Sequence, residues 1–589
     1  MMAEPRILNV YGPGTFTDRE IISVPADAHR ILRALAVKTI GFTNDEATLS
    51  KVRFEGDADP VIPGPIKSTP VAAALHAMAG ILADEILTLR GSSNPDRTVV
   101  VNTTHTALWL GSVVAVYLDH QAIITLLREK KTFESLVPDW QQRGLDPGLN
   151  PLLKLRTTAV YPTKTPGQWY SLHGSLNPEP MLRNLGINPF PQDPITNLSE
   201  AAGYLRKATA NMTPAEIEYA NLSAGHCGTI CHTPTSWANT IMGKALSAHP
   251  LIDVIPQPTH STPLPPIPFP HFNPANPLPL SGVKVLELAR IIAAPAASSI
   301  LASVGATVIK VNAPQLPDMS VLQLTLTAGK ITTCLDLRDA ADLAQFHSLL
   351  QEADIFIQGF RPGVLDKFGL SQDDILTIAT KRNRGIVYVT ENCFGPDGVY
   401  ATRPGWQQIA DCASGVAYVM GRAYNLPDGE PVLPSLPISD MTCGLVCAVG
   451  AMIGLMNRAK KGGSWIVRGS LVRVDTFLLG KEVGLYSREV VERCQERFQW
   501  GEMRGEHHVL ELLRMTWEGW ARDGNMGGYL REGAEWWEAW EESAFDGKRL
   551  SILRPVVRFE GQGVDEKGQP RWRTWGVPYG FCEKGSVAF

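Results

Sequence analysis

The chain has 589 residues, of which 44% are hydrophobic and 19% charged, and its formal net charge is −5. This length is too great for one hydrophobic core and predicts two or three globular domains. The slightly acidic balance gives no reason to expect a nucleic acid or an anionic membrane as partner, and nine cysteines in a chain this long indicate reduced thiols in an intracellular compartment.

We recognise no targeting signal at either end of the sequence. The opening Met-Met-Ala-Glu-Pro-Arg does not read as a signal peptide, and the closing Val-Ala-Phe is no peroxisomal tripeptide. We find no apolar run of the roughly 18 residues that a membrane span needs. A cytoplasmic protein with no transmembrane segment is the resulting expectation.

Residues 1–254 form the first predicted part. Apolar periodicity predicts helices over 71–89 and 214–224, while the runs 98–102 and 108–117 read as strands. Residues 255–279 follow as a linker, because ten prolines in that stretch interrupt any regular pattern and favour an extended, semi-rigid connector.

Residues 280–480 read as an α/β core. A buried strand over 283–288, an alanine-rich helix over 293–302 and a second strand over 307–311 predict a parallel, Rossmann-like sheet, since a parallel return needs a crossover. Further strands are expected at 354–358, 385–390 and 465–474, with a helix over 442–458. No GxGxxG stands between the first strand and the helix, so a dinucleotide fingerprint is absent.

Residues 481–589 differ in character from the core. The stretch 490–520 is charged and reads as helical, and Trp536, Trp537 and Trp540 form an aromatic cluster. We interpret this cluster as a cover for a neighbouring surface rather than a ligand site.

Five motifs in the second part resemble the family III CoA-transferases, a family that includes the α-methylacyl-CoA racemases. In chain order they are Pro-Leu-Ser-Gly-Val-Lys-Val-Leu-Glu-Leu at 279–288 with Gly-Ala-Thr-Val-Ile-Lys-Val at 305–311, Gly-Lys at 329–330 with Leu-Asp-Leu at 335–337, Ala-Asp-Ile-Phe-Ile-Gln-Gly-Phe-Arg-Pro-Gly at 353–363, Phe-Gly-Pro-Asp-Gly at 394–398 with Ala-Ser-Gly at 413–415, and Leu-Pro-Ile-Ser-Asp at 436–440. The resemblance implies that family's fold, a Rossmann-like parallel sheet with additional smaller α+β elements. It also implies coenzyme A as co-substrate, with an acyl-CoA and a carboxylic acid as partners.

Asp440 is the candidate catalytic residue. Its place before a predicted helix suits an N-cap, because a capping carboxylate accepts the free backbone N–H groups there. The resemblance implies more, since the family's aspartate at this position is the nucleophile in transferases and an acid/base in racemases. The implied reaction is acyl-CoA:carboxylate CoA transfer through an aspartyl anhydride and an aspartyl-CoA thioester. An α-methylacyl-CoA racemase or epimerase, and a non-catalytic acyl-CoA-binding protein, remain as alternatives.

Trp406 is the residue that separates the first two alternatives. It falls where the racemases are similar in carrying a histidine, and an indole cannot serve as the base that racemisation needs. We expect Trp406 to form a wall of the substrate pocket.

The resemblance also carries over CoA contacts. Ala293 and Ala294 lie where the CoA chain would pass, Phe360 matches the adenine-side aromatic, and Arg361 and Lys330 are candidate phosphate partners. The chain departs from the family at Asn312, where a glutamate is usual, at Gly359, where an asparagine is usual, and after Asp318, where no arginine follows.

No metal is expected. The run from His226 to His232, with Cys227 and Cys231, resembles a metal box, but no second Cys/His cluster completes it.

A possible internal repeat bears on the assembly. Pro-Ile-Lys-Ser at 65–68 and its alanine-rich helix with Gly80 resemble Pro-Ile-Ser-Asp at 437–440 and the helix with Gly454. By this resemblance residues 1–254 look like the rear and the smaller domain of a family III CoA-transferase. A homodimer and an intramolecular pseudo-dimer of two family halves are therefore both open.

Overall fold

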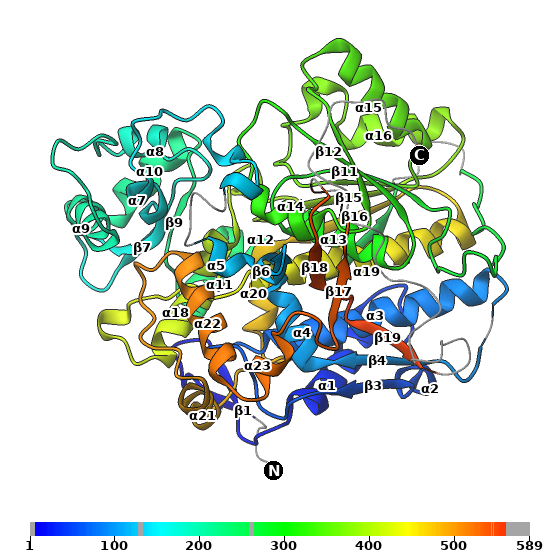
Figure 1. Cartoon of the computed structure of the whole chain (residues 1–589), viewed down its shortest axis with the longest axis horizontal. Coiled ribbons are helices and arrows are strands. Elements are labelled where there is room, and N and C mark those ends of the chain that lie inside the picture. The colour runs from blue at the N-terminus through cyan, green and yellow to red at the C-terminus, as the bar shows by residue number, and fades with distance from the viewer. Residues whose placement is uncertain are drawn as a thin grey trace.

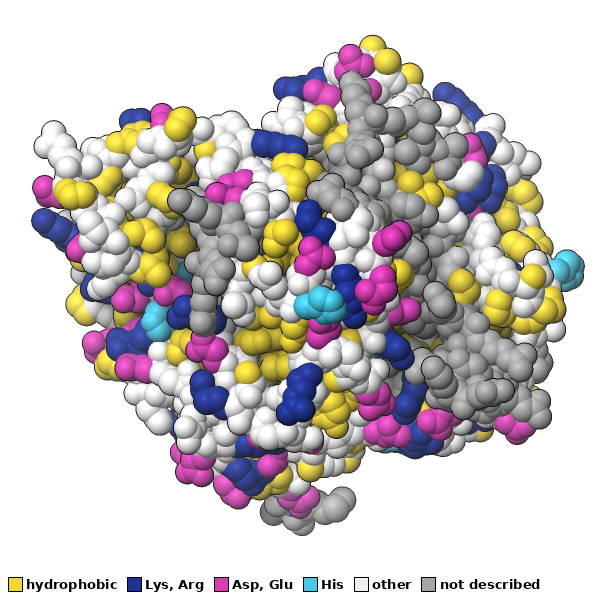
Figure 2. All heavy atoms as spheres, viewed as in Figure 1, with side chains coloured by type: hydrophobic (Ala, Val, Ile, Leu, Met, Phe, Trp, Pro, Cys, Tyr) yellow, Lys and Arg dark blue, Asp and Glu magenta, His cyan; other side chains and the backbone are white. Residues whose placement is uncertain are grey.

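The computed structural model describes residues 6–92, 94–127, 134–257, 264–543, 545, 547–560 and 589. A seven-stranded sheet and its helices occupy one side of the molecule, and a smaller lobe around α7–α10 projects on the other (Figure 1). Acidic and basic side chains are interspersed over the face seen in Figure 2.

The large sheet has the strand order β10-β16-β15-β14-β11-β12-β13. Its strands are β10 (Asp253–Pro256), β11 (Lys284–Leu288), β12 (Thr307–Asn312), β13 (Lys330–Cys334), β14 (Ile355–Gln358), β15 (Val387–Asn392) and β16 (Trp465–Ser470). All neighbours pair in parallel except β10, which lies antiparallel on β16. The order of the six parallel strands is that of a Rossmann fold, with a topological switch between β11 and β14. The predicted fold class is therefore confirmed.

Helices cover both faces of this sheet. On one face, buried side chains of β11 and β12 pack against α15 (Ala340–Glu352) and α16 (Gln372–Lys381). On the other face lie α13 (Ala293–Ser303) and the long α19 (Ile438–Lys461). The alanines and glycines of α13 and α19 let the two helices approach closely, because small side chains reduce the distance between helix axes. A Cβ added at Gly444 would lie 2.7 Å from the Ala296 Cβ.

Four further helices belong to the same part of the chain as the large sheet. They are α14 (Ser320–Leu326), α17 (Gln407–Ser414), α18 (Val416–Ala423) and α20 (Leu471–Leu478).

The first part and the last hundred residues build their sheets together. Strand β19 (Val557–Glu560) pairs with β4 (Thr98–Asn102), and β18 (Leu550–Leu553) pairs with β5 (Val116–Leu118). Trp536 stacks on His105 at a centroid distance of 4.9 Å, which confirms the prediction that the tryptophans cover a neighbouring surface. The division at residues 254, 279 and 480 stays a prediction, since the segments on either side of it share sheets.

The remaining helices and strands of these two segments have the following bounds. In the first part they are β1 (Arg6–Leu8), β2 (Phe16–Asp18), α1 (Val24–Lys38), α2 (Glu46–Leu49), β3 (Val52–Glu55), α3 (Ser68–Leu89), α4 (Thr103–Leu110), β6 (Gln121–Ala122), α5 (Ile123–Leu126), α7 (Pro151–Arg156), β7 (Thr158–Pro162), β8 (Trp169–His173), α8 (Glu179–Asn184), α9 (Leu198–Thr209), α10 (Pro214–Ser223), β9 (Gly228–Ile230), α11 (Pro234–Asn239) and α12 (Ile241–Ser247). In the last part they are α21 (Arg488–Phe498), α22 (Val509–Arg522), α23 (Met526–Tyr529) and β17 (Trp537–Trp540).

Three predicted elements differ from the structure. The expected strand over 108–117 is mostly the end of α4 and a turn before β5, and the strand over 465–474 ends at Ser470, where α20 begins. Ser470 caps that helix by accepting the backbone N–H of Arg473, a signal that the apolar run had obscured. The helix over 490–520 is two helices, α21 and α22. In the proline-rich linker, β10 extends to Pro256, and residues 258–263 lie outside the described residues.

Two helices correct the expectation that no segment reaches the length and hydropathy of a membrane span. Both α3 and α19 do so, with mean hydropathy of 1.4 and 1.7 over 18 residues, and those windows are 83% and 94% buried inside the molecule. They are packed against each other and against the sheets. The expectation of reduced thiols also needs amendment, because among the described residues seven cysteines are free and Cys334 is disulfide-bonded.

The structure contains a repeat of helix, strand and helix. The run α3–β4–α4 has the same order as α19–β16–α20, and in each case a polar side chain, Asn102 or Ser470, caps the last helix. Gly80 and Gly450 hold the same place in the two long helices, where an added Cβ would lie 2.6 Å and 2.5 Å from a valine of the following strand. Gly450 is therefore the position in α19 that is equivalent to Gly80 in α3, whereas the sequence comparison paired Gly80 with Gly454.

Candidate active site

Asp440 lies in the first turn of α19, at the edge of the sheet where the parallel strands end. The predicted N-cap role is wrong, because the helix begins earlier, at Ile438, with Pro437 as N-cap and no side-chain cap. The side chain of Gln407 from α17 holds this turn instead. Its Oε1 accepts the Asp440 backbone N–H at 3.3 Å, and its Nε2 donates to the Leu436 carbonyl at 2.9 Å. A carboxylate in a first helical turn still benefits from the positive end of the helix dipole.

The Asp440 carboxyl is half-buried, and burial raises its pKa to about 7. A second carboxyl stands nearby on the end of β15. Burial, and then the charge of Asp440, raise the pKa of Glu391 to about 8. Near neutral pH, ionisation of both carboxyls at once is therefore unfavourable, because the site is poorly solvated and the two negative charges repel each other.

Behind Asp440 lies a pair of buried aspartates that sequence reasoning missed. The Ser439 hydroxyl lies within hydrogen-bonding distance of Asp411 of α17 and of Asp475 of α20, and Ser414 donates to the second Asp475 oxygen at 3.3 Å. Burial raises the pKa of Asp411, which the charge of Asp475 raises further, and burial raises the pKa of Asp475 to about 8. The signal in the sequence was an acid within each of two apolar helical runs.

Ala293 and Ala294 form the buried first turn of α13, directly after the end of β11. An added Cβ at Gly444 would lie 2.9 Å from the Ala293 carbonyl oxygen, so the starts of α13 and α19 are in contact. An added Cβ at Gly359, just beyond β14, would lie 3.2 Å from the Ala294 Cβ. The structure therefore brings both alanines to the switch point between β11 and β14, beside the helix that carries Asp440.

Trp406 immediately precedes α17 and is half-buried. Its ring stacks on His173 of β8 at a centroid distance of 5.2 Å, and its Nε1 donates to the Ser175 hydroxyl at 3.3 Å. Burial lowers the pKa of His173 to about 4, so this imidazole is neutral near pH 7. The tryptophan thus joins the lobe of β7–β9 to the helix that holds Gln407.

Lys330 is placed differently from a surface phosphate ligand. Its Nζ lies 2.9 Å from Glu287 and 2.7 Å from the Pro295 carbonyl, and Lys310 lies 2.6 Å from the other Glu287 oxygen. All three charged side chains are completely buried. The ammonium of Lys330 therefore fixes the start of α13 through Pro295, and reaches no solvent.

Phe360 and Arg361 follow Gly359, just beyond the carboxyl end of β14 and beside the switch point. Phe360 is half-buried against the core formed with α15 and α16, and Arg361 is exposed. The guanidinium has no hydrogen bond or ion pair with another side chain among the described residues. It is close enough to lower the pKa of Cys227 in the first part, although burial raises that pKa more strongly. The predicted CoA residues are therefore brought to one edge of the sheet, except for the enclosed charge of Lys330.

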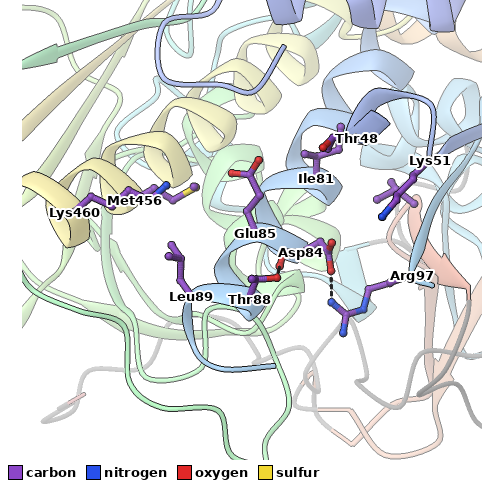
Figure 3. Close-up of a pocket in the computed structure, with 11 residues that line it drawn as sticks. Thr48, Lys51, Ile81, Asp84, Glu85, Thr88, Leu89, Arg97, Met456 and Lys460 are labelled. Atoms are coloured by element: carbon purple, nitrogen blue, oxygen red, sulfur yellow. Dashed lines mark hydrogen bonds and ion pairs between the residues drawn. The ribbon is translucent and has the colours of Figure 1, made fainter. Parts of the chain in front are cut away.

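A cavity of about 360 Å³ lies at the other end of α3 and α19 (Figure 3). It is lined by charged side chains of both signs, namely Lys51, Asp84, Glu85, Arg97 and Lys460. Met456, in the same lining, is about 24 Å along the helix from Asp440 at 1.5 Å per residue. This cavity is separate from the candidate active site. Within the described ranges, no group of three or more His, Cys, Asp or Glu side chains could hold a metal ion.

Comparison with known proteins supports the resemblance seen in the sequence. The profile described as CoA-transferase family III matches residues 280–505. A protein named "Acyl-CoA transferase" from Gibberella moniliformis (strain M3125 / FGSC 7600) is 40% identical over 98% of both chains. "Acetyl-coenzyme A transferase nodX" of Hypoxylon pulicicidum is 28% identical over 89% of this chain and 87% of its own. The succinyl-CoA–L-malate CoA-transferase alpha subunit of Chloroflexus aurantiacus is 30% identical over 34% of this chain and 47% of its own.

Proposed function

Because the chain belongs to CoA-transferase family III, we propose that it moves coenzyme A from an acyl-CoA to a carboxylic acid, with Asp440 as the nucleophile. The observation that carries the proposal is the position of Asp440. It is a half-buried carboxyl in the first turn of α19, facing the switch point of a Rossmann-like sheet, where ligands of such sheets bind.

The chemistry suits a carboxylate in this place. A carboxylate oxygen of Asp440 attacks the thioester carbonyl, the C–S bond breaks, and a mixed anhydride forms with release of CoA thiolate. The thiolate then attacks the aspartyl carbonyl, which leaves an aspartyl-CoA thioester and frees the first acid. A second acid takes the CoA by the same steps in reverse. The reaction as a whole exchanges one thioester for another, so no other energy source is needed.

Reaction through an anhydride requires that water be kept out. The stacked pair of Trp406 and His173 ties the lobe of β7–β9 to α17, next to the turn that Gln407 holds. We infer that this contact forms one wall of the acyl pocket and limits the entry of water.

The same positions suggest a path for CoA. The pantetheine chain would run past Ala293 and Ala294 toward Asp440, and the exposed Arg361, with Phe360 beside it, would meet the nucleotide end. Lys330 would act indirectly, by fixing the first turn of α13 through the Pro295 carbonyl.

We also infer that the chain is an intramolecular pseudo-dimer with one active centre. The repeated units α3–β4–α4 and α19–β16–α20 meet through their long helices. The first turn of α3 contains no acidic residue, whereas that of α19 contains Asp440. The start of α3 is occupied instead by the buried Lys67, which pairs with Asp18 and Asp27.

The test uses the full chain with acetyl-CoA and succinyl-CoA as donors and a set of carbon-labelled carboxylic acids as acceptors. We expect CoA to appear on the labelled acid, and mass spectrometry of the quenched enzyme to find a CoA adduct on the peptide containing Asp440. Asp440→Asn should abolish transfer without lowering the thermal midpoint. Turnover without any adduct on that peptide would count against the nucleophile.

The same assays run in D2O distinguish the proposed transferase from the second candidate, a racemase or epimerase. Deuterium at the α-carbon of the acyl group, without exchange of CoA between acids, would favour it. The side chain of Trp406 offers no base for that reaction.

A further inference from the structure

Glu391 is a buried carboxyl to which the reaction above gives no role. Its side chain is 9% exposed, and within the described part of the chain no hydrogen bond or ion pair reaches its carboxylate. Buried charges are ordinarily paired, so an unpaired carboxyl beside the proposed nucleophile needs a reason.

Two glycines make room for this side chain, Gly469 within β16 and Gly359 just beyond the end of β14. Glu391 pairs with Gly469 across β15 and β16, and Gly359 follows the pair of Gln358 with Thr390 on the opposite side. An added Cβ at Gly469 would lie 3.7 Å from the Glu391 Cγ, and one at Gly359 would lie 3.5 Å from its Oε2. The carboxyl therefore lies in a trough at the switch point, next to the first turn of α13.

The trough lies against α19, the helix that carries Asp440. An added Cβ at Gly469 would also lie 3.0 Å from the Cys443 Sγ, so the side chain of Glu391 passes under α19 at Cys443. Cys443 is three residues after Asp440 and thus on the same helix face. The charge of Asp440 acts on Glu391, and the charges of both carboxyls act on Cys443.

We propose that Glu391 donates a proton to the CoA sulfur as the thioester breaks, and takes it back as that sulfur attacks the aspartyl carbonyl. The assignment rests on the proposed function and adds a catalytic residue to it.

The proton and charge balance at every step. At the start Asp440 is ionised and Glu391 is protonated, so the pair carries one negative charge. When the Asp440 oxygen bonds to the acyl carbon and the C–S bond breaks, sulfur takes the Glu391 proton, and the charge now lies on Glu391. When sulfur attacks the Asp440 carbonyl, its proton returns to Glu391 and the charge leaves on the released carboxylate. The poorly solvated site thus never holds two negative charges.

The groups that face Glu391 agree with this arrangement. Burial first, and other thiol and carboxyl charges second, raise the pKa of Cys393, so the thiol at the end of β15 is neutral. Its hydrogen bond with Cys447, and burial, raise the pKa of Cys443 on α19. Asp440 is thus the charged group that acts on Glu391 among the described residues.

The experiment compares Glu391→Gln with the wild-type enzyme over pH 6–10, using the donor and acceptor pair that turns over in the screen above. The glutamine has nearly the same shape as the glutamate but has no titratable proton to donate. We expect kcat to fall about 100-fold or more, the range for loss of a general acid–base group, with KM little changed. We also expect the variant to lose the alkaline decline in rate that deprotonation of Glu391 produces in the wild type.

A matched control is Asp475→Asn, which removes a buried carboxyl of similar pKa whose two oxygens are held by Ser439 and Ser414, and should keep the alkaline decline. The wild type alone supplies a second measurement, because proton transfer to sulfur should make turnover slower in D2O than in H2O. An unchanged alkaline decline in Glu391→Gln, or equal rates in the two solvents, overturns the assignment. A missing adduct on Asp440 would instead overturn the proposed function, so the two failures are distinguishable.

Discussion

The buried cluster of Glu287, Lys310 and Lys330 gives a prediction whose size follows from the structure. Glu287→Gln keeps the shape of the side chain but removes the one anion between two ammonium groups, both completely buried. Leaving a buried charge without its partner costs about 3–5 kcal/mol. For a unit of the size of this sheet, we therefore expect a fall in the thermal midpoint on the order of 10 °C at pH 7.

The pH dependence of that loss has a definite sign. Burial lowers the pKa of Lys330 to about 8, although Glu287 acts in the opposite direction. Without Glu287 the folded-state pKa of this lysine falls further below its unfolded value, so the unfolded chain binds more protons. Stability of the variant should then rise as pH increases from 7 toward 10, and the gap to the wild type should narrow.

The assay is thermal unfolding followed by circular dichroism, with a triple variant as control. Glu287→Leu, Lys310→Met and Lys330→Met together replace the cluster by apolar side chains, and such replacements are often neutral or stabilising. A midpoint for Glu287→Gln within about 1 °C of the wild type, well under the shift expected from lost charge pairing, would refute the reasoning. A triple variant as unstable as the single one would refute it equally.

Two further predictions concern packing and a second buried acid. Because burial raises the pKa of Asp475 to about 8, its folded form keeps a proton that the unfolded chain loses above about pH 4, and stability falls as pH rises between these values. Asp475→Asn should make the thermal midpoint fall less steeply from pH 5 to pH 8, and parallel curves would contradict this. Gly444→Ala should cost about 1–3 kcal/mol, since its Cβ would lie 2.7 Å from that of Ala296. Gly203→Ala is its control in an uncrowded helix, where calorimetry should find a gain of about 0.5–1 kcal/mol.

The sequence predicted the parts of the fold in which one pattern dominates. The apolar runs that became β11 and β12, and the alanine-rich run that became α13, lie within a residue or two of their predicted bounds. The strand predicted over 465–474 failed in its second half because Ser470 and the apolar residues after it serve a helix equally well. Short apolar runs do not distinguish the two by periodicity alone.

The candidate site was less accessible from sequence. Asp440 was found through a motif, but its helix starts earlier than its local sequence suggested, because Gln407 from another helix stabilises that turn. Glu391 was missed because its setting depends on Gly469 in β16 and on Gly359 just beyond β14, and such neighbours appear only when the sheet is assembled. The enclosure of Lys330 has the same origin, since Glu287 and Lys310 belong to different strands.

Strand β10 ties the first part of the chain to the seven-stranded sheet. It pairs along β16 from Asp253 to Pro256, so β16 would become an unprotected border if everything before residue 280 were removed. Such a border offers free N–H and C=O groups to other molecules and favours aggregation. The point where the family match begins is therefore a poor place to cut the polypeptide.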